Sequence, residues 1–439
     1  MILTVDLGTT RTKAVLWGDD GPVASGSAAL STSHPAPGWA EQDAGQWWPS
    51  VVEACAAARR GTSWDGVEAV GFAAARQSVV PVTDDGAPTG PALLWSDRRG
   101  GGTVPGKAQW LRAHAPERLA LARWLLAPRD LVAWHLTGTV ATDPTLASLP
   151  AECVLAPPVL PSTAVLGPLL PGPAAELGVP AAVPVVLGAG DRQCEVLGTC
   201  ATAAHPMVSW GTTANVSFPI ASPWERTPLR VTRGALDGWL LEGGLAAAGS
   251  LLAWVGGLTG MGVDALAAAA AAVPPGAGGV ICLPWLGGAR APWWRTGAAA
   301  GFLGLGAGHG PGELARAAME GVAFELARCI EASGTVPSAL ALAGGAGLSP
   351  WADIVTAVTG VPGIVRASGE AASVGALVVT SCALGRPVDV GACNPVTAVI
   401  TPPPSIVERY RELRAASDAA VAAVLPLAPP AGPGDEAGA

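Results

Sequence analysis

The sequence predicts an α/β protein made of two similar lobes. The chain has 439 residues, which is more than one hydrophobic core usually supports and suits two domains. Half of the residues are hydrophobic and only 13% are charged, while glycine and proline number 58 and 41, a profile typical of a globular protein with many turns. The third observation is a strand–turn–strand pattern around a Gly-Thr-Thr sequence, which occurs twice in the chain.

The first copy of this pattern lies at the N-terminus. Residues 1–5 are apolar and partly β-branched, which predicts a buried strand, and residues 13–17 predict a second strand that pairs back on it. The turn between them offers backbone N–H groups and hydroxyls to a phosphate, and its flanks offer a carboxylate for Mg²⁺ and a positive charge. An ordinary hairpin with a polar tip is the alternative. The candidate contacts are Asp6 for Mg²⁺ and Thr9, Thr10 and Lys13 for phosphate.

The second copy spans residues 206–220 and has Gly211 and Thr212 at its turn. Two such hairpins predict duplicated lobes that each offer a phosphate loop to a shared cleft. This is the arrangement of the actin-like ATPase fold, in which two ribonuclease H-like lobes hold ATP in a central cleft. We expect an N-terminal lobe at 1–203, a C-terminal lobe at 204–425 and a disordered tail at 426–439, where proline and glycine dominate.

Charge and cysteine usage exclude several classes of function. The net charge is −9 and the two lysines are Lys13 and Lys107, so we expect neither a nucleic-acid surface nor binding to anionic membranes. Asp6 and Arg11 interrupt any N-terminal apolar run, which predicts no signal peptide. We expect the uncharged stretch 243–263 to form helix and loop in a core. The eight cysteines show no metal-binding spacing, which favours reduced thiols in a cytoplasmic protein.

In the first lobe, polar residues lie between predicted strands. The strands at 67–73 and 79–82 flank Arg76 and Gln77, at a strand end where ligands tend to bind. Farther on, Arg98 and Arg99 are more plausibly a solvated surface pair than a site. The sequence from Gly101 to Lys107 matches most of a Walker A loop, but it lacks the hydroxyl and the preceding strand, so we interpret Lys107 as the start of a helix. Another helix is predicted at about 128–136.

A strand at 185–187 and a glycine turn precede Asp191, which opens an apolar helix. This carboxylate has two interpretations, an N-cap or a general base that faces the cleft.

In the second lobe, residues 240–258 predict a glycine turn at Gly243 and Gly244 followed by a helix. Residues 301–310 are rich in glycine but miss the dinucleotide-binding spacing. Gly344 and Gly345 follow a strand at 339–343 and precede a helix at about 349–359, a turn against which a base and ribose fit. Further helices are predicted at 265–273, 313–332 and 370–383, and a further strand at 280–285.

With these elements in place, the chain resembles the FGGY carbohydrate kinases and, among them, is most similar to the xylulokinases. The similarity extends over nearly the whole length, and eight motifs occur in the family's order. They are DLGTT (6–10), GWAEQDAGQWW (38–48), LLWSDRR (93–99), GAGD (188–191), WGTT (210–213), GGAR-P (287–292), GGAGLSPWADIVTAVTG (344–360) and EAASVGA (370–376).

The resemblance implies transfer of the γ-phosphoryl group of ATP, with Mg²⁺, to a hydroxyl of a sugar, polyol or sugar acid. It makes Asp191 the base that takes the proton of the attacking hydroxyl, and Asp6 the holder of the Mg²⁺ waters. Positioning and charge neutralisation dominate such chemistry. By the same resemblance, the β- and γ-phosphates contact Thr9, Thr10, Lys13, Gly211 and Thr212, while Gly304 lines the phosphate region and Gly344, Gly345 and Ser349 border the adenosine.

Three departures from the family pattern concern the acceptor. Where xylulokinases carry Gln-Met-His-Gly, this chain has Ala-Arg-Gln-Ser, and Arg76 is similar to the arginine of glycerol kinases, with Gln77 in place of their glutamate. Arg192 follows the base and is a candidate partner for an acidic substrate. The segment between Arg99 and Lys107 is shorter than in relatives, so the sugar pocket is open, completed by a partner in a homodimer, or defective. The alternative function is a catalytically weak nucleotide-binding relative that acts as a sensor or scaffold.

Overall fold

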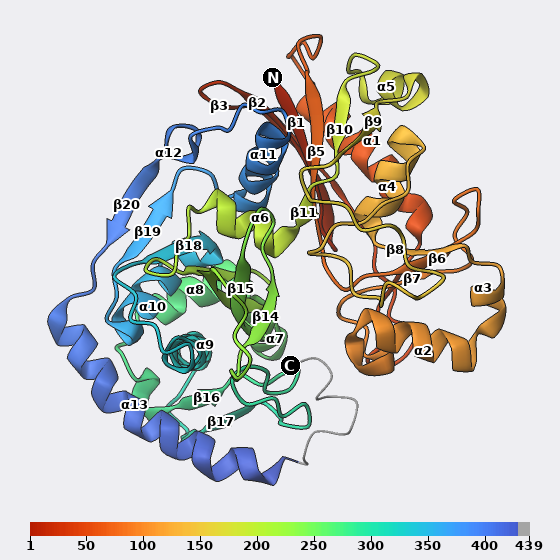
Figure 1. Cartoon of the computed structure of the whole chain (residues 1–439). Coiled ribbons are helices and arrows are strands. Elements are labelled where there is room, and N and C mark those ends of the chain that lie inside the picture. Colours follow the sequence, from red (N-terminus) through yellow and green to blue (C-terminus); the bar gives the residue numbers. More distant parts are fainter. Residues whose placement is uncertain (429–439) are drawn as a thin grey trace. The chain divides into compact units, whose positions relative to one another are not determined.

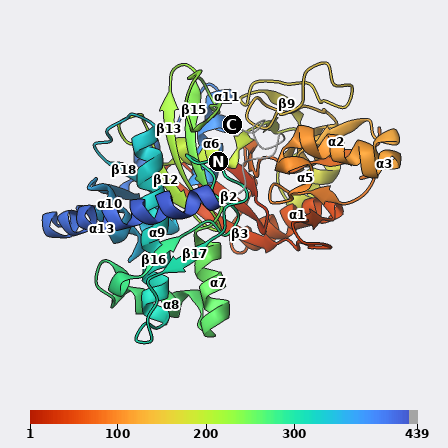
Figure 2. The same cartoon turned by 90° about the horizontal axis from the view of Figure 1, so that it is seen from below.

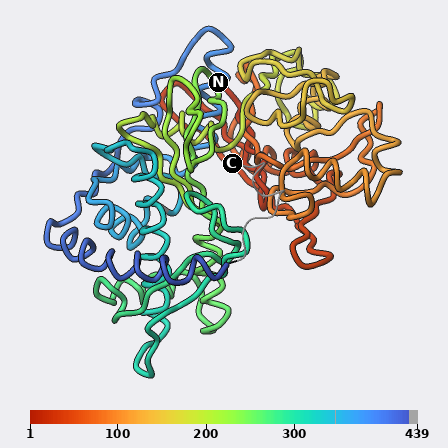
Figure 3. Tube along the Cα trace, turned by 60° about the horizontal axis from the view of Figure 1, so that its bottom comes forward, coloured from red at the N-terminus to blue at the C-terminus, as the bar shows by residue number. Residues whose placement is uncertain are grey.

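The computed structural model describes residues 1–428, and the chain divides into two compact units (Figure 1). Unit 1 contains Met1–Gly198, Arg233–Asp237 and Glu370–Pro395, and unit 2 contains Thr199–Thr232, Gly238–Gly369 and the residues from Val396 on. Figure 3 traces the chain, which returns to unit 1 after it has built most of unit 2. The lobe boundary at 203/204 remains a prediction. Of the predicted tail at 426–439, residues 426 and 427 belong to a short 3-10 helix, Leu425–Leu427, and 429–439 lie outside the described residues.

Unit 1 is built on a mixed sheet in the order β3-β2-β1-β5-β10-β9, with β11 paired to β5. The N-terminal hairpin is confirmed: β1 and β2 are antiparallel, with Asp6 opposite Lys13. β1 runs parallel to β5, which carries the predicted strand at 67–73. The strands are β1 Ile2–Leu7, β2 Arg11–Gly18, β3 Gly21–Ala29, β5 Ala69–Ala74, β9 Val165–Pro168, β10 Pro184–Val186 and β11 Ala189–Gly190.

The helices of unit 1 pack on this sheet and on two small sheets. Helices α11 and α6 pack at close range. A Cβ added to Gly375 of α11 would lie only 1.9 Å from the carbonyl oxygen of Cys194 on α6, so this contact requires glycine. The helices are α1 Trp47–Ala58, α2 Val104–His114, α3 Pro116–Ala120, α4 Pro128–Thr137, α5 Pro171–Leu177, α6 Asp191–Gly198, α11 Ala371–Ala383 and α12 Val390–Cys393. The small sheets pair β4 Glu41–Gln42 with β7 Ala92–Leu93 and β6 Val80–Val82 with β8 Trp124–Leu126.

Unit 2 repeats this design with a sheet in the order β14-β15-β13-β12-β18-β19-β20. The second predicted hairpin is confirmed as β12 and β13, and β12 runs parallel to β18 as β1 does to β5. The predicted glycine turn at Gly243 and Gly244 is wrong, because both residues lie inside strand β15. The strands are β12 Met207–Trp210, β13 Ala214–Ile220, β14 Arg230–Arg233, β15 Trp239–Leu245, β18 Leu340–Gly344, β19 Gly363–Arg366 and β20 Val396–Ile400.

Helix α9, Pro311–Ala332, forms the centre of the helical layer of unit 2 and is buried from Ala315 to Ile330. Figure 2 shows α13 crossing α9 and α10, and Arg328 of α9 ion-pairs with Asp418 of α13. The other helices are α7 Gly249–Thr259, α8 Val263–Ala271, α10 Trp351–Thr359 and α13 Pro404–Val424, and β16 Ile281–Leu283 pairs with β17 Gly301–Leu303.

Within residues 1–428, we find no individual helix with both the length and the apolar character that a membrane span requires. Helices α7 and α8 meet that requirement only when taken together, and they are bent by 96° relative to each other.

Candidate active site

Asp6, at the end of β1, is the most perturbed carboxyl of the predicted site. Burial, which is the main cause, and the negative charge of Asp191 together raise its pKa to about 7, although Lys13 opposes the shift. The residue keeps some exposure, but its Oδ1 is enclosed and has no hydrogen-bond partner among the described residues. A buried carboxylate oxygen without a donor is costly, so this atom fits a cation or a water held by a cation.

Lys13 forms an ion pair with Glu370, the residue that precedes α11. The sequence analysis did not assign a role to Glu370, although it begins one of the motifs. Glu370 and Glu195 also raise the pKa of Asp6. Asp6, Asp191, Glu195 and Glu370 together form what we call the acidic centre of unit 1. Lys13 is the cation that the N-terminal hairpin contributes to this centre.

The turn at Thr9 is held from two sides by side chains. The indole Nε1 of Trp95 donates to the Thr9 hydroxyl oxygen at 2.8 Å, and Gln42 Nε2 donates to the Thr9 carbonyl at 2.5 Å. An indole N–H only donates, so the Thr9 hydroxyl accepts there and keeps its own proton for another acceptor. That proton is the one a phosphate oxygen needs. Thr10, the next residue, is exposed, and its carbonyl accepts from Leu30 N at 2.9 Å.

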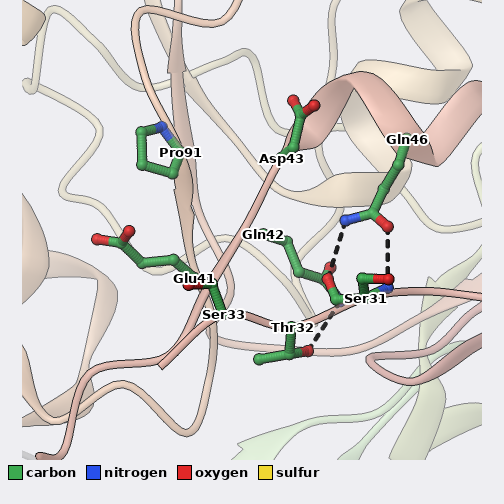
Figure 4. Close-up of a pocket in the computed structure, with 8 residues that line it drawn as sticks. All are labelled: Ser31, Thr32, Ser33, Glu41, Gln42, Asp43, Gln46 and Pro91. Carbon is green, nitrogen blue, oxygen red and sulfur yellow. Dashed lines mark hydrogen bonds between the residues drawn. The ribbon is translucent and has the colours of Figure 1, made fainter. Parts of the chain in front are cut away.

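A cavity of about 400 Å³ in unit 1 borders Gln42, one of the two residues that support Thr9 (Figure 4). Gln42 lines this cavity and also donates to Thr32 Oγ1, while Gln46 exchanges two hydrogen bonds with Ser31. The predicted site residues are not among the residues that line it. The lining residues are Ser31, Thr32, Ser33, Glu41, Gln42, Asp43, Gln46 and Pro91.

Asp191 is the first residue of α6 and directly follows the short strand β11. Its Oδ1 accepts from the backbone N–H of Arg192 at 2.7 Å. The stem of Arg76 packs on the preceding residue, because a Cβ on Gly190 would lie 2.8 Å from Cγ and Cδ of Arg76. The structure thus places the Arg76 side chain against Gly190, the residue that directly precedes Asp191.

Arg192 and Gln77 both have protein partners. The Arg192 guanidinium donates to Glu195 Oε2 at 2.7 Å, one turn along α6. Gln77 has a left-handed backbone with φ of 59°, and its amide bridges two segments, accepting from Val104 N and donating to Ser148 Oγ, both at 3.1 Å. The Gln77 amide therefore fixes the chain between β5 and β6 against α2.

Lys107 is fully buried and has a structural role that the sequence did not reveal. It lies inside α2, which begins at Val104 and not at Lys107 as predicted. The 3-10 turn that precedes the helix agrees with the rejection of a Walker A loop. The Lys107 Nζ donates to the carbonyls of Gln77 at 2.7 Å and Gly102 at 3.0 Å. The Lys107 pKa is lowered to about 7, because burial outweighs the opposing effect of the Asp97 charge. The shortened segment is thus a tight loop fastened by a buried amine.

The interpretation of Arg98 and Arg99 as a solvated surface pair is wrong for Arg99, which is buried, whereas Arg98 is exposed as predicted. The Arg99 guanidinium is buried, donates to Asp97 at 2.6 Å and Glu41 at 2.7 Å, and lies 3.9 Å from the ring centre of Trp39. A guanidinium is planar and weakly hydrated, which suits both a buried ion pair and an aromatic face.

In unit 2, two of the predicted nucleotide segments meet. Gly211 and Thr212 form the turn after β12, and Gly344 is the last residue of β18, paired with Trp210 in the parallel register. A Cβ on Gly344 would be 2.8 Å from the Trp210 carbonyl oxygen, so this close approach requires glycine. The N-terminus of α7 closes the turn, since Ser250 Oγ donates to the Thr212 carbonyl at 2.8 Å.

Ser349 and Gly304 have other surroundings. Ser349 is exposed and donates to Asp353 Oδ2 at 2.6 Å in the first turn of α10. Gly304 has φ of 79° and follows β17, in the two-stranded sheet, where a Cβ would be 2.6 Å from the Gly279 carbonyl oxygen. The sequence placed both near nucleotide, and those roles remain predictions.

Comparison with known proteins identifies the family of this architecture. Residues 1–106 match the N-terminal domain and residues 207–384 the C-terminal domain of the FGGY family of carbohydrate kinases. The chain belongs to the FGGY family. It is 30% identical over 423 residues to the xylulose kinase of Escherichia coli K12, covering 84% of this chain and 87% of that one. It is 32% identical over 416 residues to the glycerol kinase of Thermus brockianus, with 79% and 80% coverage.

The solved structures support the same fold class. A ligand-bound xylulose kinase from Lactobacillus acidophilus superposes with a TM-score of 0.87 at 21% identity, covering 97% of this chain and 99% of that one. The predicted fold class, duplicated actin-like lobes of α/β type, is confirmed. This FGGY protein is an ATP-dependent carbohydrate kinase, a phosphotransferase with an alcohol group as acceptor and a small sugar or polyol as substrate.

Proposed function

We propose that the acidic centre of unit 1 carries out the phosphoryl transfer of this FGGY kinase, with Asp191 as the general base. The carboxylate of Asp191 takes the proton of the acceptor hydroxyl, whose oxygen forms a bond to the γ-phosphorus of ATP while the bond to the ADP oxygen breaks. The single observation that carries the proposal is the electrostatic coupling of Asp191 to Asp6, the carboxyl with an enclosed and unpartnered oxygen.

The surroundings of Asp6 fit a hydrated Mg²⁺ ion. Its enclosed Oδ1 has no donor among the described residues, and its neighbours in the acidic centre are carboxylates, the oxygen donors that Mg²⁺ prefers. When bound, Mg²⁺ neutralises charge on the transferring phosphoryl group. Asp6 would hold it, and the chain itself supplies Lys13 as a second positive charge when Lys13 exchanges its partner Glu370 for a phosphate.

We propose nucleotide contacts in each unit separately. In unit 1, the hydroxyls of Thr9 and Thr10 and the Lys13 ammonium bind the β- and γ-phosphates. Support comes from the Trp95 hydrogen bond, which leaves the Thr9 proton available. In unit 2, the close packing at Gly344 supports a role in nucleotide binding for the segment beside the second hairpin. The residues of unit 2 are Gly211, Thr212, Gly304, Gly344, Gly345 and Ser349.

For the acceptor, we propose a neutral polyol or sugar. Arg192, the candidate partner for an acidic substrate, is ion-paired with Glu195, so its charge is already compensated. Arg76 packs on the residue before Asp191, a position suited to a donor for an acceptor hydroxyl. The proposed effect of Gln77 on the acceptor is indirect, because its amide holds the backbone between β5 and β6 in place. A cytoplasmic location and a homodimer remain predictions.

The test is an ADP-release screen with Mg-ATP over pentuloses, polyols, hexoses and sugar acids, run on the wild type and on Asp191→Asn. We expect acceptor-dependent ADP release from one neutral class, reduced by about 10²-fold or more in the variant. Activity on sugar acids alone would reject the acceptor proposal. No acceptor-dependent release in any class, with ATP still bound, would favour the sensor or scaffold function instead.

A further inference from the structure

A buried charged network in unit 1 surrounds the backbone that leads into Asp191. Its centre is Arg129, in the first turn of α4, which is fully buried together with Asp130 and Asp143. The guanidinium is 2.7 Å from Asp130 Oδ1 and 2.9 Å from Asp143 Oδ1. Burial by itself lowers the Arg129 pKa, but the two carboxylates outweigh burial and raise it, so the guanidinium stays charged.

The Nη1 group of Arg129 is directed at the segment of chain just before Asp191. Arg129 Nη1 donates to the carbonyl oxygens of Leu187 at 3.1 Å and Gly188 at 2.8 Å. Gly188 has φ of 78°, and a Cβ there would be 2.0 Å from the Phe72 carbonyl oxygen. The turn at Gly188 therefore packs tightly against β5 on one side, and on the other side it accepts hydrogen bonds from the buried Arg129 guanidinium.

A second arm of the network reaches the residue next to Asp191. Asp143 Oδ2 accepts from the hydroxyls of Thr145 and Ser162, both at 2.7 Å. Because the Thr145 proton is committed to Asp143, its oxygen is an acceptor, and Gly190 N donates to it at 2.7 Å. Residues 187, 188 and 190 are thus each bonded to the network, within four residues of Asp191.

We propose that the Arg129–Asp143–Thr145 network positions the Asp191 carboxylate for proton transfer and that Thr145 is its positioning residue. The inference rests on the proposed role of Asp191. A helix-opening residue takes its direction from the backbone before it, and a misplacement of about 1 Å at a reacting group costs on the order of 10²-fold in rate.

The test is Thr145→Val, which keeps the shape of the side chain but removes the acceptor for Gly190 N. We expect kcat to fall by about 10- to 100-fold with KM for ATP changed less than twofold, and Thr145→Ser to restore most of kcat. The matched control is Thr137→Val, which removes a half-buried hydroxyl that donates to Ala133 O at 2.8 Å and accepts from Thr139 N at 3.1 Å, and should leave kcat unchanged.

The decisive comparison repeats Thr145→Val in the Asp191→Asn background, where we expect no further loss of kcat. An equal loss in both backgrounds, or an unchanged kcat in folded Thr145→Val, would overturn the inference. If Thr145→Val does not fold, Ser162→Ala removes a donor to Asp143 and should lower kcat about 3- to 10-fold; an unchanged kcat there would equally overturn it. Full activity of Asp191→Asn alone would instead reject the proposed function.

Discussion

Replacing the buried lysine of α2 by methionine should remove a pH dependence of stability that wild type shows. Lys107 is fully buried, and its pKa falls from the usual 10.5 to about 7 in the folded chain. Between these values the unfolded chain binds more protons than the folded one, so the free energy of unfolding rises with pH. Because each pKa unit corresponds to about 1.4 kcal/mol, the rise between pH 6 and 9 is about 2.5 kcal/mol.

The assay is urea unfolding of wild type and Lys107→Met at pH 6, 7, 8 and 9. Other titrating groups affect both proteins alike, so the difference between their free energies of unfolding isolates Lys107. The variant also loses the bonds to Gln77 and Gly102, which adds a constant offset at every pH. We expect wild type to gain about 2.5 kcal/mol relative to the variant from pH 6 to 9. A difference that does not change with pH would refute the buried-amine account.

Three further predictions concern ligand contacts. Trp95→Phe removes the donor to Thr9 and should raise KM for ATP several-fold, whereas Trp48→Phe, which loses only a bond to Glu176, should not; equal values would contradict the orientation of the Thr9 hydroxyl. Arg76→Ala should raise KM for the acceptor more than KM for ATP in steady-state kinetics, and an equal effect on both would count against an acceptor role. Glu370→Gln frees Lys13 and should strengthen ATP binding in calorimetry at low salt, and weaker binding would show that the pair preorganises Lys13.

The parts of the fold that follow from local sequence were predictable. Apolar β-branched runs on both sides of a Gly-Thr-Thr turn predicted both hairpins, since the strands and the turn are encoded within about 15 residues. The error at Gly243 and Gly244 has a physical cause. Glycine usually marks a turn, but here Gly243 lies in a strand because a Cβ would be 2.6 Å from the Cβ of Cys329 on α9, a contact that the local sequence does not reveal.

Site residues that belong to a motif were predicted from the sequence, whereas residues whose role depends on burial were missed. Asp6, Lys13 and Asp191 stand in recognisable motifs, and the structure brings them into one electrostatic centre. Arg99 is buried beside Glu41, which is 58 residues away, and Lys107 donates to Gln77, which is 30 residues away. Such contacts between distant segments are not visible in the local sequence. The Arg129 network was missed for the same reason, because Arg129 meets Gly188 only through the fold.

The measurement that tests the central claim most directly is the single-turnover rate of phosphoryl transfer in Asp191→Asn, loaded with Mg-ATP and mixed with saturating acceptor. The account predicts a rate at least about 10²-fold below that of wild type, with an unchanged dissociation constant for ATP. A transfer rate equal to that of wild type would contradict the assignment of Asp191 as the base.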